Sequence, residues 1–78
     1  MQYRKFKSMM LVYGAKVIEG DNELIIVTEQ DGSELARVST KQMFNIKMDD
    51  NLNELKGHVA NVIYNFCDSL ARTPIDER

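Results

Sequence analysis

An Asp-Gly dipeptide between two runs of strand-forming residues places the strongest constraint on the fold. Residues 23–30 have the sequence ELIIVTEQ, residues 33–40 have the sequence SELARVST, and Asp31 and Gly32 lie between them. Asp-Gly flanked by such runs is typical of a β-hairpin. We therefore predict that the two runs pair antiparallel around a turn at Asp31-Gly32.

The side chains of these runs indicate the register of the hairpin. A two-residue loop would put Glu29 opposite Glu34, and like charges that face each other across two strands are unfavourable. A three-residue loop, residues 30–32 with a left-handed Gly32, gathers apolar residues on one face. This second register pairs Leu24 with Val38 and Ile26 with Ala36. We predict the second register.

Two further runs predict strands on either side of the hairpin. Residues 9–18, MMLVYGAKVI, are rich in strand-favouring types, and Gly14 within them suggests a bulge or a close backbone approach. Residues 43–48, MFNIKM, alternate between apolar and polar side chains, as a half-buried strand does. The chain therefore has candidates for four strands.

A long helix is predicted over residues 51–72. Asn51 can cap its start, and Glu54 can reach back to the cap. Apolar residues then recur at spacings of three and four, which forms one stripe on a helix: Leu52, Leu55, Val59, Val62, Ile63, Phe66 and Leu70. Pro74 ends the helix, because it pushes the preceding residue out of the helical region. We expect a single helical turn or an ordered tail after it.

The predicted fold class is therefore α+β: an antiparallel β-meander of three to four strands, followed by one long C-terminal α-helix packed on one sheet face. The 78 residues make one small domain, residues 1–78. The hydrophobic fraction of 44% and the charged fraction of 28% are those of a globular protein, which argues against disorder.

Two of the predicted strands carry apolar residues on both faces, whereas a single helix can cover only one face. The residues on the second face define a predicted interaction surface: Met10, Val12, Ile25 and Val27. An exposed apolar patch of this kind usually marks an interaction site. We predict a homodimer or a complex with another protein; the alternative is that residues 1–7 or the tail after Pro74 cover the patch.

A second functional hypothesis concerns the N-terminal segment. Arg4, Lys5 and Lys7 are interleaved with Tyr3 and Phe6, and basic residues with aromatics can grip phosphates and stack on bases. The alternative is an edge strand whose charges prevent aggregation. The formal net charge of −2 excludes a positive field over the whole molecule. We keep a nucleic-acid contact through these residues as the rival to protein binding.

Catalytic chemistry has few candidates in this chain. His58 falls on the polar side of the predicted helix, and Cys67 falls near the apolar stripe, about 13.5 Å away along the helix axis. A lone histidine is a poor metal-ligand set, and no nucleotide-binding, hydrolase or metalloprotease motif occurs. We predict that the protein is not an enzyme and needs no cofactor or metal.

The chain also indicates a compartment. Its single cysteine cannot form a disulfide within the chain, which favours a reducing cytoplasm, and no apolar run is long enough to span a membrane. The basic segment before MMLVYGA is similar to the start of a signal peptide. Because Lys16 follows this short apolar stretch at once, we favour a basic-led strand in a cytoplasmic protein.

Two short stretches resemble a loose group of uncharacterised short proteins from phages and prophages of Gram-positive bacteria. Residues 31–39 match the Asp-Gly hairpin followed by an ELxAxVS pattern, and residues 73–78 match an ending of Thr-Pro, an aliphatic residue, two acidic residues and arginine. The resemblance implies a small phage or prophage accessory protein that acts by binding a host or phage protein. It implies no catalytic or binding residue.

Overall fold

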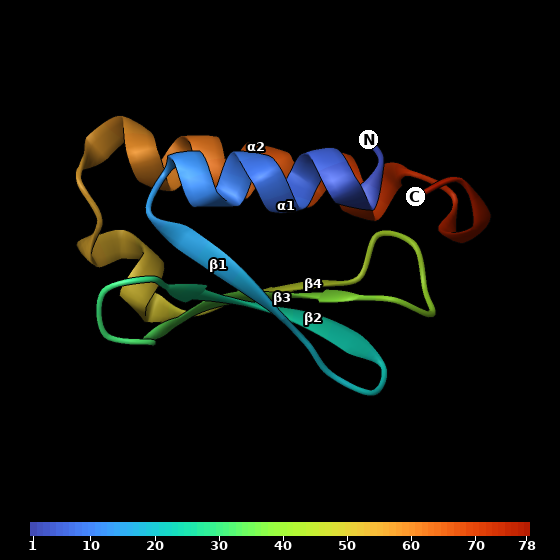
Figure 1. Cartoon of the computed structure of the whole chain (residues 1–78), viewed down its shortest axis with the longest axis horizontal. Coiled ribbons are helices and arrows are strands. Elements are labelled where there is room, and N and C mark those ends of the chain that lie inside the picture. The colour runs from blue at the N-terminus through green and yellow to red at the C-terminus, as the bar shows by residue number, and fades with distance from the viewer.

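Four strands form one antiparallel sheet in the order β1-β2-β3-β4 (Figure 1). The computed structural model describes all 78 residues. The strands are β1 (Ala15–Glu19), β2 (Glu23–Thr28), β3 (Glu34–Ser39) and β4 (Ile46–Met48). The helices are α1 (Tyr3–Val12) and α2 (Gly57–Arg72), with short 3-10 helices η1 (Asp50–Glu54) and η2 (Ile75–Glu77). The predicted α+β class is confirmed, with a four-stranded antiparallel sheet and a C-terminal helix packed on it.

The central hairpin has the register that the apolar pattern predicts. Leu24 pairs with Val38, and Ile26 pairs with Ala36. Gly32 has a φ of 74°, the left-handed conformation expected at this turn. Beyond Ile26 the register shifts, so that β3 contains a bulge at Leu35. Because of this bulge, the adjacent Leu35 and Ala36 are both buried in the core. The Thr28 N–H donates to the Ser33 carbonyl at 2.9 Å, so the loop spans residues 29–32 and the predicted three-residue loop is wrong.

The N-terminal strand predicted over residues 9–18 is wrong in its first half, which belongs to the helix α1. Phe6 and Met10 are four residues apart, so a helix places both on one face, where they are fully buried. Gly14 ends this helix with a φ of 80° and donates its N–H to the carbonyl of Leu11. Only residues 15–19 form a strand, β1.

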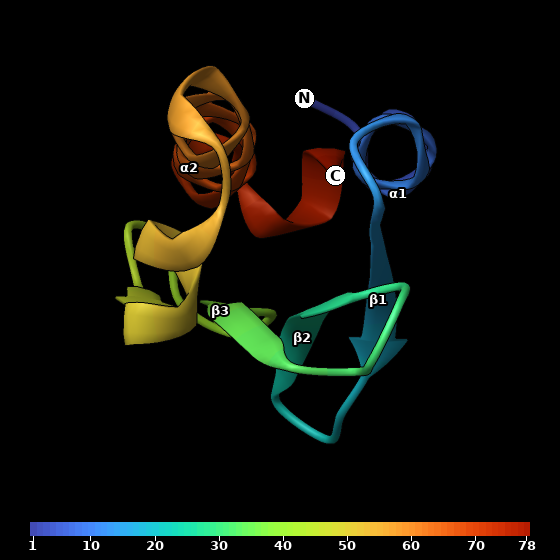
Figure 2. The ribbon, with the colours of Figure 1, turned by 90° about the vertical axis from the view of Figure 1, so that its left-hand side faces the viewer.

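Both helices cover the same face of the sheet, which we call the inner face (Figures 1 and 2). α1 contacts β1 and α2, and α2 contacts β3 and β4. The two helices run antiparallel. The rings of Tyr13, at the end of α1, and Phe66, in α2, form a tilted aromatic pair with centroids 6.3 Å apart. The main core lies between this pair of helices and the inner face.

The predicted helix over residues 51–72 is divided into two. Asp49, not Asn51, caps the first part, because its carboxylate accepts the N–H of Asn51 at 3.0 Å. The chain is extended at Leu55 and Lys56, and α2 then begins at Gly57. Gly57 thus lies at the start of α2 and does not interrupt the helix interior.

The fourth strand is shorter than the predicted run 43–48. Phe44 has a φ of 61°, which an aromatic residue rarely adopts, and its N–H donates to the carbonyl of Ala71 at 2.9 Å. This bond joins the loop before β4 to the end of α2. The Phe44 side chain is 67% exposed instead of lying on the same face as Ile46.

The tail after Pro74 forms an ordered turn, as its sequence indicates. Figure 2 shows this turn between the two helices, on the inner side of the sheet. Arg78 anchors it: the guanidinium donates to the carbonyls of Ser39, Thr73 and Ala71 at 2.6, 3.0 and 3.3 Å. Residues 1–7 and 73–78 therefore cover the inner face, and not the second face of the sheet.

Neither α1 nor α2 has the length and apolar character needed to cross a membrane.

The helical placement of residues 3–12 predicts that truncating Met10 and truncating Val12 have different effects on stability. The predicted strand would instead place both side chains on one face, and similar effects would be expected. Met10→Ala should lower the free energy of unfolding by about 2–5 kcal/mol, because it opens a cavity in a packed core. Val12→Ala should change it by about 0.5 kcal/mol or less, because Val12 is 71% exposed. Denaturant unfolding of both variants measures this. Equal losses would contradict the helical placement of residues 3–12.

Candidate functional site

The four residues of the predicted interaction surface do not form one surface. Met10 is fully buried under α1, and Val27 is 4% exposed. Ile25 is half-buried on the outer face of the sheet, and Val12 is exposed at the end of α1, which packs over the inner face. The predicted strand placement of Met10 and Val12 is wrong, because both lie in the helix α1, and the buried Met10 and Val27 have no exposed side chain to offer a partner. The predicted homodimer stays a prediction.

The outer face of the sheet carries a short apolar strip and an ion-pair cluster. Ile18 is directly opposite Ile25 in the β1–β2 pair, and its side chain is 47% exposed. Arg37 of β3 pairs with both Glu23 and Glu34. The hydrogen bonds from Arg37 lower the pKa of Glu34 and, with those to Glu23, raise the pKa of Arg37. This guanidinium is already paired with two carboxylates and is not free for a ligand.

The basic residues predicted to contact nucleic acid lie on the exposed side of α1. Arg4, Lys5 and Lys7 are all exposed, and no carboxylate pairs with any of them. The Lys7 Nζ atom lies 5.8 Å from the centroid of the Tyr3 ring. Phe6, in contrast, is fully buried and presents no ring for stacking on a base. The structure therefore leaves the three cations exposed on α1 with Tyr3 beside Lys7, but it removes Phe6 as a stacking partner.

Charge is distributed unevenly along the chain, and the fold keeps this separation. Residues 1–18 contain four basic side chains and no acidic one. Residues 19–78 contain six basic and twelve acidic side chains. Because residues 3–12 form one helix, three of the four N-terminal cations belong to α1. An acidic protein thus carries one basic helix.

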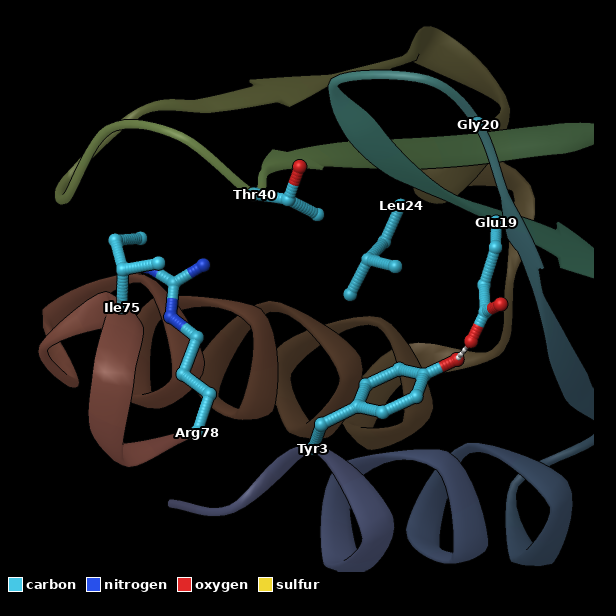
Figure 3. A pocket seen from close by; sticks show the side chains of 7 residues that line it. All are labelled: Tyr3, Glu19, Gly20, Leu24, Thr40, Ile75 and Arg78. Carbon is cyan, nitrogen blue, oxygen red and sulfur yellow. Dashed lines mark hydrogen bonds between the residues drawn. The ribbon is translucent and has the colours of Figure 1, made fainter.

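A cleft of about 290 Å³ lies between α1, the sheet and the tail (Figure 3). Tyr3 enters it from α1, Leu24 from β2 and Thr40 from the loop after β3. Ile75 and Arg78 line it from the tail, and Glu19 and Gly20 line it from the end of β1. Leu24 lies in the middle of the cleft, with the Glu19 carboxylate toward one end and the Arg78 guanidinium, beside Ile75, at the other.

The carboxylate end of the cleft is formed by Tyr3 and Glu19. The Tyr3 hydroxyl donates to Glu19 Oε1 at 2.6 Å, which ties α1 to β1. Partial burial and this hydrogen bond to a carboxylate raise the pKa of Tyr3 to about 12. The phenol therefore stays a proton donor over the whole physiological range.

The guanidinium end of the cleft is formed by Arg78. Its three hydrogen bonds all go to backbone carbonyls, and no carboxylate pairs with it. Burial lowers the pKa of Arg78, because the charged form loses solvation. A guanidinium has five N–H donors, so two remain after these three bonds. Arg78 is a partly desolvated cation with donor capacity left.

The two residues considered for catalysis do not form a site. Cys67 is fully buried in the core, and burial raises the pKa of its thiol to about 12. His58 is exposed in the first turn of α2. No group of three or more His, Cys, Asp or Glu side chains is arranged to hold a metal ion.

Comparison of the chain with protein-family models, with curated proteins and with solved structures gives no match. The structure itself offers three candidate binding features: the cations of α1 with the exposed Leu11 and Val12, the apolar pair Ile18 and Ile25, and the cleft. Of these, the sequence indicates the cations. The cleft joins residues 3, 19, 24, 40 and 78, which are distant in the chain, and no local pattern connects them.

The Tyr3–Glu19 bond predicts a pH dependence of stability. In the unfolded chain Tyr3 ionises at its ordinary pKa of 10.0, and in the folded protein it ionises only near 12. Between these values the folded state holds more protons than the unfolded state, so stability falls as the pH rises. Tyr3→Phe should remove this contribution, and the stability difference between wild type and Tyr3→Phe should shrink from pH 10.0 to about 12.

Denaturant unfolding at a series of pH values measures the difference. Tyr64→Phe is the matched control, because it removes an exposed phenol on α2. A difference between wild type and Tyr3→Phe that stays constant over this pH range would contradict the bond.

Proposed function

We propose that this protein is a non-catalytic binding protein that docks an acidic amphipathic segment of a partner protein on α1. The binding surface, called the α1 surface below, consists of Arg4, Lys5, Lys7, Leu11 and Val12. The observation that carries the proposal is that three unpaired cations share one helix with two strongly exposed apolar side chains.

The cations and the apolar residues of the α1 surface are ordered along the helix. Arg4 and Leu11 are seven residues apart, and so are Lys5 and Val12. Seven residues make two helical turns, so each pair lies on one side of α1, roughly 10.5 Å apart at about 1.5 Å per residue. A partner helix with acidic residues two turns from apolar residues would match both pairs at once.

The exposure of the apolar residues favours a protein over a nucleic acid. Leu11 is 53% exposed and Val12 is 71% exposed. Apolar side chains of this kind gain from burial against another apolar surface, and a phosphate backbone offers none. The twelve acidic residues of the remaining chain would also repel a long polyanion. Nucleic-acid contact through Arg4, Lys5 and Lys7 is kept as the rival outcome of the test.

The resemblance of residues 31–39 and 73–78 to short phage and prophage proteins supports the same type of function. Small accessory proteins with this context would act in the cytoplasm of a host cell, by binding a host or phage protein. We propose that context for this chain. It requires no catalytic residue, and the proposal gives none to His58 or Cys67.

Self-association is a separate part of the proposal, and it concerns the outer face of the sheet. Ile18 and Ile25 form an apolar pair on β1 and β2, and β1 is an edge strand with one free side. Pairing of two copies about a twofold axis would cover Ile18.

Light scattering tests this self-association. It should give the mass of two chains for wild type and of one chain for Ile18→Lys. A wild-type monomer at micromolar concentration would contradict the proposed dimer.

A designed helical peptide tests the α1 surface directly. The peptide carries two leucines followed, two turns later, by two glutamates, and its control has lysines in place of the glutamates. In an NMR titration, the acidic peptide should shift the amide signals of residues 3–13. Replacing Arg4, Lys5 and Lys7 together by Glu should weaken binding about tenfold or more, because attraction becomes repulsion.

The chain offers a matched control for this variant. Lys41, Lys47 and Lys56 are exposed and lie outside α1. Replacing these three by Glu changes the net charge by the same amount and should leave peptide binding within about twofold. Equal losses in both variants would show a general charge effect. Tighter binding of duplex DNA or RNA than of the acidic peptide, lost in the α1 variant, would establish the nucleic-acid reading instead.

A further inference from the structure

We infer that the cleft between α1, the sheet and the tail binds a small organic carboxylate with a short apolar body. The ligand's carboxylate would pair with Arg78, and its body would lie against Leu24 and Ile75. This inference is independent of the α1 surface, because it uses neither Arg4, Lys5 and Lys7 nor the two exposed apolar residues.

The charge of Arg78 is the first reason. Its guanidinium lies at one end of the cleft, bonded only to carbonyl groups. Carbonyls orient the group without neutralising it, whereas a carboxylate supplies both charge and paired acceptors in the geometry of the guanidinium fork. Arg37 of β3, in contrast, already pairs with two carboxylates. Arg78 has no carboxylate partner, so an anionic ligand would supply the missing counter-charge.

The shape of the cleft is the second reason. Figure 3 shows Leu24 projecting into the cleft between Ile75 and Arg78 on one side and Tyr3 and Glu19 on the other. A volume of about 290 Å³ is close to the lower end of the range for small-molecule sites, which begins at about 300 Å³. Leu24 in the middle and Ile75 beside Arg78 suit a short-chain carboxylate, whose apolar body would lie against these two side chains.

The rigidity of the walls is the third reason. Hydrogen bonds fix the residues at both ends: Tyr3 donates to Glu19, and Arg78 donates to Ser39. A ligand therefore enters a site whose charged groups are already placed, which lowers the entropic cost of binding. Glu19 at the far end is an acceptor, so a ligand that carries an ammonium group away from its carboxylate would gain a second contact.

A series of ligands with one carbon skeleton tests the inference on the wild-type protein. Caproate, caproamide and hexylamine share an unbranched six-carbon skeleton and differ in the end group, which is anionic, neutral and cationic respectively. In NMR titrations, caproate should shift the amide signals of the cleft, from Tyr3, residues 19–24, Thr40 and residues 75–78. It should bind about tenfold or more tightly than caproamide, the change expected from a charge-assisted hydrogen bond.

Comparison of caproate with ε-aminocaproate identifies the ligand class more closely. Tighter binding of ε-aminocaproate would indicate a zwitterion that also reaches Glu19, and tighter binding of caproate would indicate a plain carboxylate. Both results support the site. Equal binding of caproate, caproamide and hexylamine would overturn the inference, and so would shifts confined to residues outside the cleft.

Two arginine variants locate the charge. Arg78→Gln should weaken caproate binding about tenfold or more. Arg72→Gln is the matched control on α2, where Arg72 is exposed and pairs with Asp68, and it should leave binding within about twofold. Because Arg78→Gln can also free the tail, the wild-type difference between caproate and caproamide decides the question. Unchanged caproate binding in Arg78→Gln would overturn the assignment to Arg78.

Discussion

Burial of the α1 side chains Phe6 and Met10 is the contact on which the rest of the structure depends. Both are fully buried, and burying side chains of this size contributes about 1.5–3 kcal/mol each. Their position makes residues 3–12 a second cover for the inner face beside α2. The same contact turns the opposite side of α1 outward, which exposes the three cations, and it places Tyr3 over the cleft.

The hairpin was predictable from sequence because its determinants are local. Asp31-Gly32 defines the turn, and the alternation of Leu24, Ile26, Ala36 and Val38 fixes the register. The helix at the start of the chain was not predicted, because the residues MMLVY are of types that favour a strand. A helical spacing is nevertheless present in Tyr3, Phe6, Met10 and Tyr13, and tertiary burial decided between the two periods.

The two candidate sites also differ in how far local sequence predicts them. The cations of α1 are adjacent in sequence, so their grouping could be predicted although their helical setting could not. The cleft depends on the tail, which returns from α2 to the space between the helices and places Arg78 near Thr40. The ordered tail was predictable from Thr73-Pro74, but its partner Ser39 lies 39 residues away and leaves no local trace.

NMR spectroscopy of residues 3–19 tests the central placement of α1 most directly. The structure predicts helical Cα shifts for residues 3–12, extended shifts only for residues 15–19, and an NOE between the rings of Tyr13 and Phe66, whose centroids are 6.3 Å apart. Extended shifts throughout residues 9–18, with no NOE from Tyr13 to Phe66, would contradict it. The inner face would then have a single helical cover, and the α1 surface would not exist.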